Sequence, residues 1–242
     1  MSTLLSVNGV SKRFRGLVAV DRVSFDVPAG GIFAVIGPNG AGKTTLFNTI
    51  AGVLPPDAGS IAFAGERIDG LPPDLICRRG IGRTFQIVRP FPALSVEDNV
   101  IVGALLHRRH VDAARERAHE VLRRLDLYDK RAQRASSLTL PDRKRLEVAR
   151  ALATDPKLLL LDEVMAGLRP TETDRMVAIL KALNRESGLT ILLIEHVMRA
   201  VVALASRILV LHHGAAIAEG EPAKVMRDPA VVHSYLGAED VA

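Results

Sequence analysis

A glycine-rich stretch at residues 37–45 constrains this chain more than any other feature of its sequence. It reads Gly-Pro-Asn-Gly-Ala-Gly-Lys-Thr-Thr and fits the phosphate-binding pattern G-x-x-x-x-G-K-[ST]. The apolar run at 32–36 predicts a buried strand before it, and apolar residues at helical spacing from Leu46 to Ala51 predict a helix after it. Between such a strand and such a helix, consecutive backbone N–H groups point into one concavity that suits a phosphate.

Each part of this stretch has an expected role toward a bound phosphate chain. The glycines let the backbone approach the phosphates closely, Lys43 is expected to reach the β- and γ-phosphates, and the Thr44 hydroxyl is expected to bind Mg²⁺. The candidate binding residues are Gly37, Pro38, Asn39, Gly40, Ala41, Gly42, Lys43, Thr44 and Thr45. The opposing interpretation, a glycine-rich turn with a chance lysine, does not explain the strand and the helix on its two sides.

Two acidic residues follow a second predicted strand. Four leucines at 158–161 lead directly into Asp162 and Glu163. A carboxylate at the carboxyl end of a buried strand, beside a phosphate loop, is placed to hold Mg²⁺, and Glu163 is placed to orient and deprotonate a water that attacks the γ-phosphate. The alternative is a strand that simply ends in two solvated acids.

Two further polar residues are weaker candidates. Gln86 follows a short strand, and its amide can touch both Mg²⁺ and the attacking water; a surface glutamine is the alternative. His196 follows the apolar run at 189–194, where an imidazole can hydrogen-bond the γ-phosphate and stabilise charge in the transition state. A lone histidine at a strand end is more often structural. The other histidines have no spacing that suggests a metal site.

The order of apolar patterns predicts an α/β fold. Alternating residues at 4–28 predict short antiparallel strands, and the continuous apolar runs at 158–161 and 189–194 predict parallel strands covered on both faces. Residues 96–155 are rich in Ala, Leu, Arg and Glu at helical spacing, and 207–220 resembles a hairpin around His213-Gly214. We therefore expect a P-loop NTPase core with a parallel sheet, an antiparallel β-subdomain and an inserted helical subdomain.

These parts are expected to form a single domain over residues 1–242. Within it, residues 1–90 and 156–242 form the nucleotide-binding core with its β-subdomain, and about 91–155 form the helical subdomain. The length of 242 residues and the 48% hydrophobic and 24% charged composition are those of an ordinary globular protein.

Charge and composition restrict the classes of partner. The net charge of +5 suits a nucleic acid, an anionic membrane surface or an acidic ligand, but the arginine pairs are dispersed and aromatic residues make up only 4% of the chain. We therefore expect a solvated basic surface and no nucleic-acid partner. The N-terminus does not resemble a secretory signal, and Arg207 interrupts the apolar stretch at 200–211. The single Cys77 can form no internal disulfide, which fits a reducing compartment.

Taken in chain order, these motifs resemble the ATP-binding subunit of ABC transporters over nearly the whole sequence. The resemblance rests on residues 37–45, Phe85-Gln86, 158–163 and 194–196. It implies that ATP and Mg²⁺ are the cofactors, that Gln86 corresponds to the Q-loop glutamine, and that His196 corresponds to the switch histidine. It also places Phe14 where the family has an aromatic ring that stacks on adenine; an ordinary core phenylalanine is the alternative.

The nearer resemblance is to the importers of branched-chain amino acids. It rests on residues 81–99 and on the tail segments 220–226 and 234–237, although importers of urea and short amides are similar. It implies an ATPase at the cytoplasmic face of the cell membrane. The implied partners are transmembrane permease subunits, a second ATP-binding subunit and, indirectly, a periplasmic or extracellular solute-binding protein. The alternatives are a weakly hydrolysing regulatory subunit and a soluble ABC ATPase that acts on ribosomes or DNA.

The chain departs from the family at two segments that face the second subunit. The family signature Leu-Ser-Gly-Gly-Gln is replaced by residues 138–142, Leu-Thr-Leu-Pro-Asp, in which Pro141 removes an N–H donor and Leu140 adds bulk. Arg169 stands where the family has the D-loop aspartate. We therefore hypothesise a heterodimer whose other subunit supplies a fuller signature; a homodimer that tolerates this sequence is the alternative.

Overall fold

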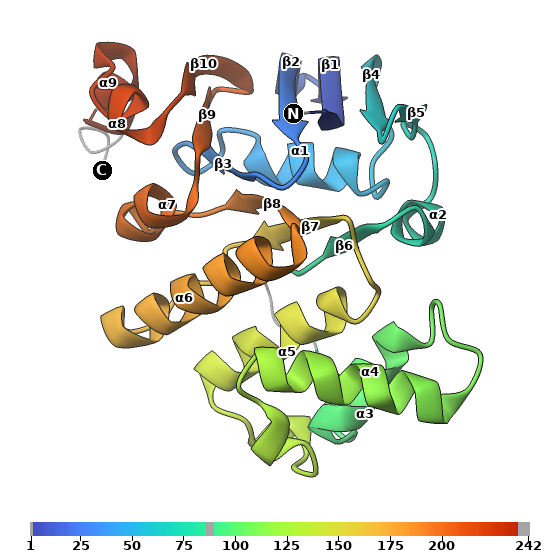
Figure 1. Cartoon of the computed structure of the whole chain (residues 1–242). Coiled ribbons are helices and arrows are strands. Elements are labelled where there is room, and N and C mark those ends of the chain that lie inside the picture. Colours follow the sequence, from blue (N-terminus) through green and yellow to red (C-terminus); the bar gives the residue numbers. More distant parts are fainter. Residues whose placement is uncertain (1, 86–89, 237–242) are drawn as a thin grey trace.

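Two β-sheets and the helices around them make up the fold in a computed structural model that describes residues 2–85 and 90–236 (Figure 1). One sheet has the strand order β2-β1-β4-β5 and the other has the order β10-β9-β3-β8-β7-β6. The predicted parallel sheet and antiparallel sheet are thus both present. The boundaries between core and helical subdomain remain a prediction.

The antiparallel sheet is built on two long strands. β1 spans Thr3–Phe14 and β2 spans Leu17–Pro28; β4 (Ala58–Phe63) and β5 (Glu66–Arg67) complete the sheet. The expectation of short strands at 4–28 was wrong, because β1 and β2 have 12 residues each and stay paired through several shifts of register. Such bulges absorb extra residues without ending a strand.

The larger sheet has β3 (Ile32–Ile36) at its centre. β8 (Thr190–Ile194) and β9 (Arg207–His212) pair with β3 in parallel, and β7 (Leu158–Asp162) and β6 (Ile81–Arg83) extend the sheet beyond β8. β10 (Ala215–Gly220) forms the predicted hairpin with β9. Every residue of β3, β7 and β8 is buried, which explains why these strands are continuous apolar runs.

Successive residues of these strands enter two different cores. Leu158 and Leu160 pack with α1 and the antiparallel sheet, whereas Leu159 and Leu161 pack with the helices on the opposite face. This alternation is the geometry of a strand covered on both sides. Because parallel strands end at the same edge, the segments after β3, β7 and β8 meet there.

Helices cover both faces of the larger sheet (Figure 1). α1 (Lys43–Ile50) lies between the sheets, and α3 (Val96–Ala104), α4 (Val111–Arg124) and α5 (Leu140–Leu152) form the predicted helical part. The remaining helices are α2 (Pro73–Arg78), α6 (Pro170–Ser187), α7 (Met198–Leu204), α8 (Pro222–Val225) and α9 (Pro229–Leu236), with short 3-10 turns at Tyr128–Lys130 and Ala135–Ser137.

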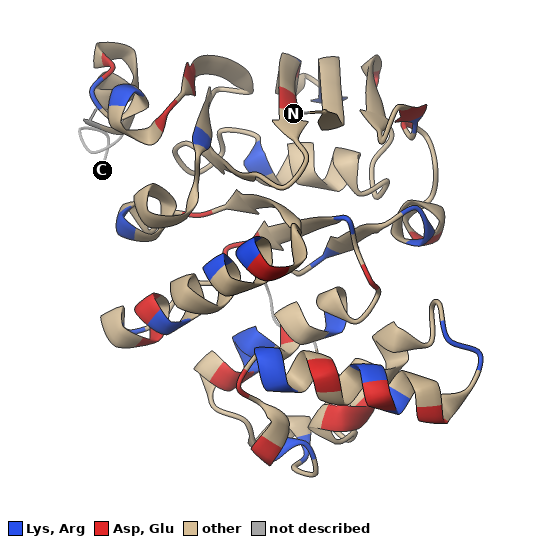
Figure 2. Cartoon of the chain, viewed as in Figure 1, with Lys and Arg blue, Asp and Glu red and all other residues tan. Residues whose placement is uncertain are grey.

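Charged residues of both signs alternate along the outer helices, as Figure 2 shows for α4 and α6. On α4, for example, Glu120 pairs with both Arg117 and Arg124. A basic residue beside an acidic one makes a mixed, solvated surface rather than a single basic tract. Within residues 2–85 and 90–236, no helix combines the length and the apolar character needed to cross a bilayer.

Candidate functional site

The loop between β3 and α1 adopts a conformation that only glycine accommodates at two positions. Gly37 has φ 148° and Gly42 has φ 100°, and a Cβ on either would lie 2.1 Å from a backbone oxygen, that of Leu211 or of Ala19. Gly42 is the N-cap of α1, so the N-terminus of that helix opens directly into the loop. The loop is therefore closely fitted against two neighbouring strands and has a defined concave shape.

Lys43 crosses this concavity. Its Nζ donates hydrogen bonds to the carbonyl oxygens of Gly37, at 2.7 Å, and Pro38, at 2.8 Å. Burial lowers the pKa of Lys43, while the nearby negative charges of Glu163 and Asp162 oppose that shift. The ammonium group is thus held at the loop, where an incoming phosphate can replace its carbonyl partners.

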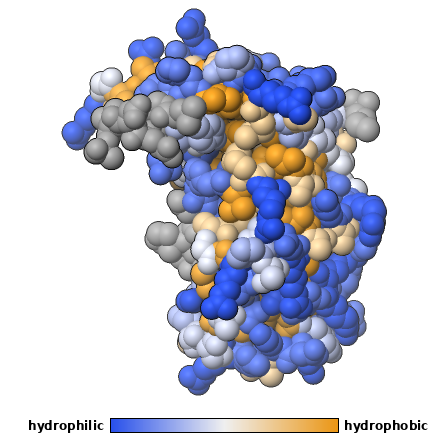
Figure 3. Space-filling view, turned by 90° about the vertical axis from the view of Figure 1, so that its left-hand side faces the viewer, coloured by the Kyte–Doolittle hydropathy of each residue, from blue (hydrophilic) through white to orange (hydrophobic). Residues whose placement is uncertain are grey.

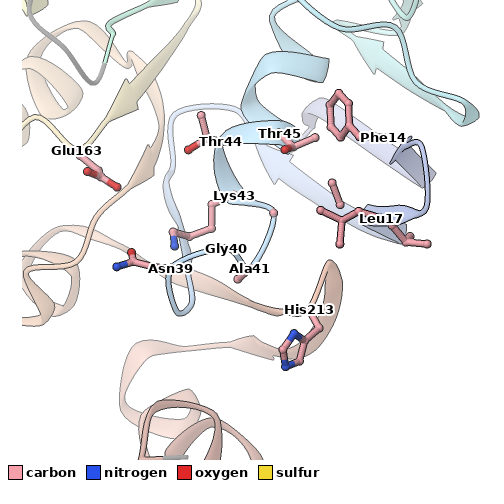
Figure 4. A pocket seen from close by; sticks show the side chains of 13 residues that line it. Phe14, Leu17, Asn39, Gly40, Ala41, Lys43, Thr44, Thr45, Glu163 and His213 are labelled. Carbon is pink, nitrogen blue, oxygen red and sulfur yellow. The ribbon is translucent and has the colours of Figure 1, made fainter. Parts of the chain in front are cut away.

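A pocket of about 460 Å³ extends from this loop. Polar side chains, including Lys43, Asn39 and Glu163, lie on one side, and Phe14 and Leu17 lie on the other (Figure 4). Such a division suits a ligand with a charged end and an aromatic end. Phe14 is 43% exposed, so the alternative of an ordinary core phenylalanine is wrong.

Four residues of the pocket were missed by the sequence analysis: Leu17, Val18, Ala19 and His213. They come from the hairpin of β1 and β2 and from the turn between β9 and β10. Hydrogen bonds join the turn between β9 and β10 to the loop and to β2, from Gly214 N to Ala41 O at 3.1 Å and from Asp21 N to Gly214 O at 2.9 Å. No local sequence signal marks them, because only the tertiary fold brings them together.

Asp162 ends β7 as a deeply buried carboxylate. Its Oδ2 lies 3.4 Å from Nη2 of Arg83, and its Oδ1 has no hydrogen-bond partner among the described residues. Burial raises the pKa of Asp162, and the Arg83 charge opposes the shift. A buried, partly unsatisfied carboxylate oxygen fits a hard cation such as Mg²⁺ or an ordered water. The interpretation of Asp162 as a solvated acid is therefore wrong.

Glu163 and His196 meet although they follow different strands, β7 and β8. His196 Nε2 and Glu163 Oε1 are 2.7 Å apart, and the backbone N–H of Glu163 donates to the carbonyl oxygen of Ile194 at 2.9 Å. Glu163 has φ 50°, an uncommon conformation for a residue with a side chain. The two side chains predicted separately as candidates thus form one cluster at the edge of the pocket.

Other residues discussed from the sequence are not part of this cluster. Gln86 lies outside the described residues, so its role stays a prediction. In the described part of the chain, no three His, Cys, Asp or Glu side chains form a group that could hold a metal ion by themselves. Cys77 is half-buried, and burial raises the pKa of its thiol.

The altered signature forms the N-terminus of α5. Thr139 is the N-cap, but its hydroxyl donates a hydrogen bond to Asp142 Oδ2 at 2.9 Å, and Lys130 and Arg145 also contact the Asp142 carboxylate. Pro141 stands in the first turn, where its missing N–H costs no helical hydrogen bond. The Thr139 hydroxyl, which stands at the serine position of the family signature, is therefore engaged within the chain itself.

A buried lysine at a glycine-rich strand–helix loop, together with an acidic pair at the carboxyl end of β7, two strands away in the same sheet, defines a P-loop nucleoside triphosphatase. The sequence model of the family described as "ABC transporter" matches residues 20–166. The chain belongs to the ABC transporter family and is the ATP-hydrolysing cassette of such a transporter.

Curated relatives and solved structures agree with this assignment. The high-affinity branched-chain amino acid transport ATP-binding protein LivG of Escherichia coli (strain K12) is 40% identical over 97% of this chain and 98% of its own length. The lipopolysaccharide export system ATP-binding protein LptB of the same organism is 38% identical over 98% of each chain. A crystal structure of the ADP conformation of an ATP-binding cassette of an ABC transporter is 31% identical and superposes with a TM-score of 0.89, covering 98% of this chain and 100% of that one.

Proposed function

We propose that this chain hydrolyses ATP to drive the import of branched-chain amino acids or of related small amino acids or amides. Two observations support the solute class: the full-length identity to LivG and the sequence at residues 81–99. The ATP-binding protein LptB of a lipopolysaccharide export system has a similar identity to this chain, so the solute requires a direct test.

In this proposal, each group that would meet ATP has its own part. Lys43 and the loop amides bind the phosphates, Phe14 stacks on the base, and Glu163 deprotonates the attacking water. The Glu163–His196 contact of 2.7 Å carries this proposal, because it joins a base and an imidazole at the edge of the phosphate pocket. His196 then stabilises charge at the γ-phosphate, so that positioning and electrostatics supply most of the catalysis.

Mg²⁺ fits the same site. Thr44 lines the pocket, Asp162 has a buried oxygen without a partner among the described residues, and Gln86 is the third proposed ligand. A bound Mg²⁺ would neutralise charge on the phosphate oxygens.

Cassettes of this family act in pairs together with transmembrane subunits. We propose that this chain pairs with a different cassette. Its own loop, acidic pair and His196 are complete, whereas the Thr139 hydroxyl is engaged by Asp142 and Leu140 is 37% exposed at the start of α5. Apolar residues also gather along the middle of the face seen in Figure 3, and an exposed apolar patch of this kind is typical of a contact surface for a partner.

The membrane subunits would dock on the helical part, at the cytoplasmic face of the membrane. Three apolar side chains next to residues 86–89 are substantially exposed: Phe85, Phe91 and Leu94. A solute-binding protein would act indirectly through the membrane subunits. Two functions compete with this proposal. A soluble ABC ATPase would not fractionate with membranes when the neighbouring membrane proteins are expressed. A weakly hydrolysing regulatory subunit would show little ATP turnover.

The test uses the assembled transporter in proteoliposomes, with uptake of labelled leucine and ATP hydrolysis measured together. Glu163→Gln in this chain should lower both by at least about a hundredfold while ATP affinity is kept, because only the base is lost. Glu186→Gln, at an exposed position on α6, is the matched control. Unchanged turnover in Glu163→Gln would contradict both the base assignment and the asymmetric pair, and hydrolysis without leucine uptake would contradict the solute.

A further inference from the structure

Two buried charged residues outside the pocket hold the backbone that follows Asp162. Lys144, on α5, is 5% exposed, and its Nζ donates a hydrogen bond to the carbonyl oxygen of Glu163 at 2.8 Å. Glu195, directly after β8, is 1% exposed, and its Oε1 accepts a hydrogen bond from the backbone N–H of Met165 at 2.8 Å. Burying a charged side chain is unfavourable, so two such groups directed at one short segment need an explanation.

The segment they hold has an uncommon conformation. Glu163 adopts φ 50°, its N–H is bonded to Ile194 O, and its carbonyl accepts from Ala166 N as well as from Lys144. A side-chain residue in the left-handed region persists only where the surroundings enforce it. The direction of the Glu163 side chain depends on this backbone conformation, because Cβ follows φ and ψ.

We propose that Lys144 and Glu195 are positioning residues for ATP hydrolysis: they clamp residues 163–165 from α5 and from the position directly after β8, and thereby orient the Glu163 carboxylate. The proposal rests on the proposed role of Glu163 as the base. Lys144 lies two residues after the altered signature and on the helix that Pro141 opens. A shift of α5 relative to β7 therefore moves Lys144 relative to Glu163. The orientation of the Glu163 carboxylate thus depends on the position of the helical part.

The charges of this cluster are arranged to keep both groups in place. The negative charges of Glu195, Glu163, Asp162 and Glu147 oppose the lowering of the Lys144 pKa by burial. On the other side, the backbone N–H groups of Met165 and His196 stabilise the Glu195 carboxylate. Each group thus has its own partner, and the two act on different peptide units of the same segment.

The first test measures the clamp itself by amide hydrogen exchange on the full chain. Lys144→Met keeps the length of the side chain without a donor, and Lys144→Arg keeps a donor. Glu195→Asp withdraws the carboxylate, and Glu195→Gln keeps the acceptor. We expect the amide hydrogen-exchange rate of the peptide covering 163–168 to rise about tenfold in Lys144→Met and Glu195→Asp. The rise should be smaller in Lys144→Arg and Glu195→Gln, because these variants keep the donor or the acceptor. Lys181→Met, at an exposed position on α6, controls for loss of a lysine charge.

The second test measures turnover in the assembled transporter. Lys144→Met and Glu195→Asp should lower kcat by about tenfold or more with little change in the KM for ATP, because the base is misplaced while the phosphate loop is intact. If Lys144→Met fails to fold, the comparison of kcat and exchange rates between Glu195→Asp and Glu195→Gln decides alone. If Glu163→Gln abolishes turnover but these variants keep both the kcat and the exchange rates of the unmodified protein, the clamp is overturned and the base stands. If Glu163→Gln keeps turnover, the base assignment itself fails.

Discussion

At the residue scale, the site depends on charges held where water cannot reach them easily. Lys43, Lys144, Asp162 and Glu195 are each at most 5% exposed. Every group is hydrogen-bonded or lies near an opposite charge, which offsets part of the unfavourable free energy of burying its charge. Such burial also links protonation to folding, and Glu195 provides the clearest case because its pKa is raised to about 7 by burial.

Replacing Glu195 by Gln should therefore change the pH dependence of stability. The unfolded chain releases this proton near pH 4.5, whereas the folded chain keeps it until about pH 7, so stability falls as pH rises through that window and is constant above it. Glu195→Gln removes the titration. Its free energy of unfolding, relative to the unmodified protein, should increase by about 2–3 kcal/mol between pH 5 and pH 8. Urea unfolding at pH 5, 6.5 and 8 measures this, with the exposed Glu186→Gln as control. If the difference in free energy of unfolding between Glu195→Gln and the unmodified protein is the same at all three pH values, the raised pKa of Glu195 is contradicted.

At the element scale, the strands and the phosphate loop were predictable because each depends on local pattern. β7 and β8 lie where continuous apolar runs were found, since a strand buried on both faces excludes polar residues. The length of β1 and β2 was not predictable, because a bulge depends on the partner strand. The approach of Leu17 and His213 to the pocket, and the contact of Arg83 with Asp162, depend on tertiary closure and leave no spacing in the sequence.

The loop before α1 provides the prediction at this scale. Gly42→Ala should abolish ATP binding, because its Cβ would lie 2.1 Å from Ala19 O and φ 100° is strained for alanine. Gly70→Ala is the matched control: Gly70 also has a positive φ, 82°, but a Cβ there meets no atom within 4 Å. We expect both variants to lose about 1 kcal/mol or more of stability from backbone strain, and only Gly42→Ala to lose binding of a fluorescent ATP analogue. Retained binding in Gly42→Ala would show that the loop can relax away from β2.

At the scale of the whole molecule, the chain carries a phosphate loop with its acidic pair and an altered signature segment. The pocket lies at the shared carboxyl edge of β3, β7 and β8, whereas the signature lies at the start of α5. We therefore expect this cassette to bind ATP in its own pocket against a partner's signature segment better than its own signature segment completes the partner's pocket. Its oligomeric state alone should therefore differ from its state beside a second, non-identical cassette.

Light scattering on Glu163→Gln protein measures this difference. Removing the base preserves any ATP-closed dimer, yet the isolated chain should remain at its monomer mass of 26.1 kDa at saturating ATP. The reason is that Pro141 offers no N–H, Leu140 adds an apolar side chain that is 37% exposed at the start of α5, and the Thr139 hydroxyl donates a hydrogen bond to Asp142. Adding Leu140→Gly and Pro141→Gly restores the donor and removes the bulk, so part of the protein should then shift to twice that mass. If the Glu163→Gln protein alone doubles its mass with ATP, the signature closes a site as it stands, and a homodimer replaces the asymmetric pair.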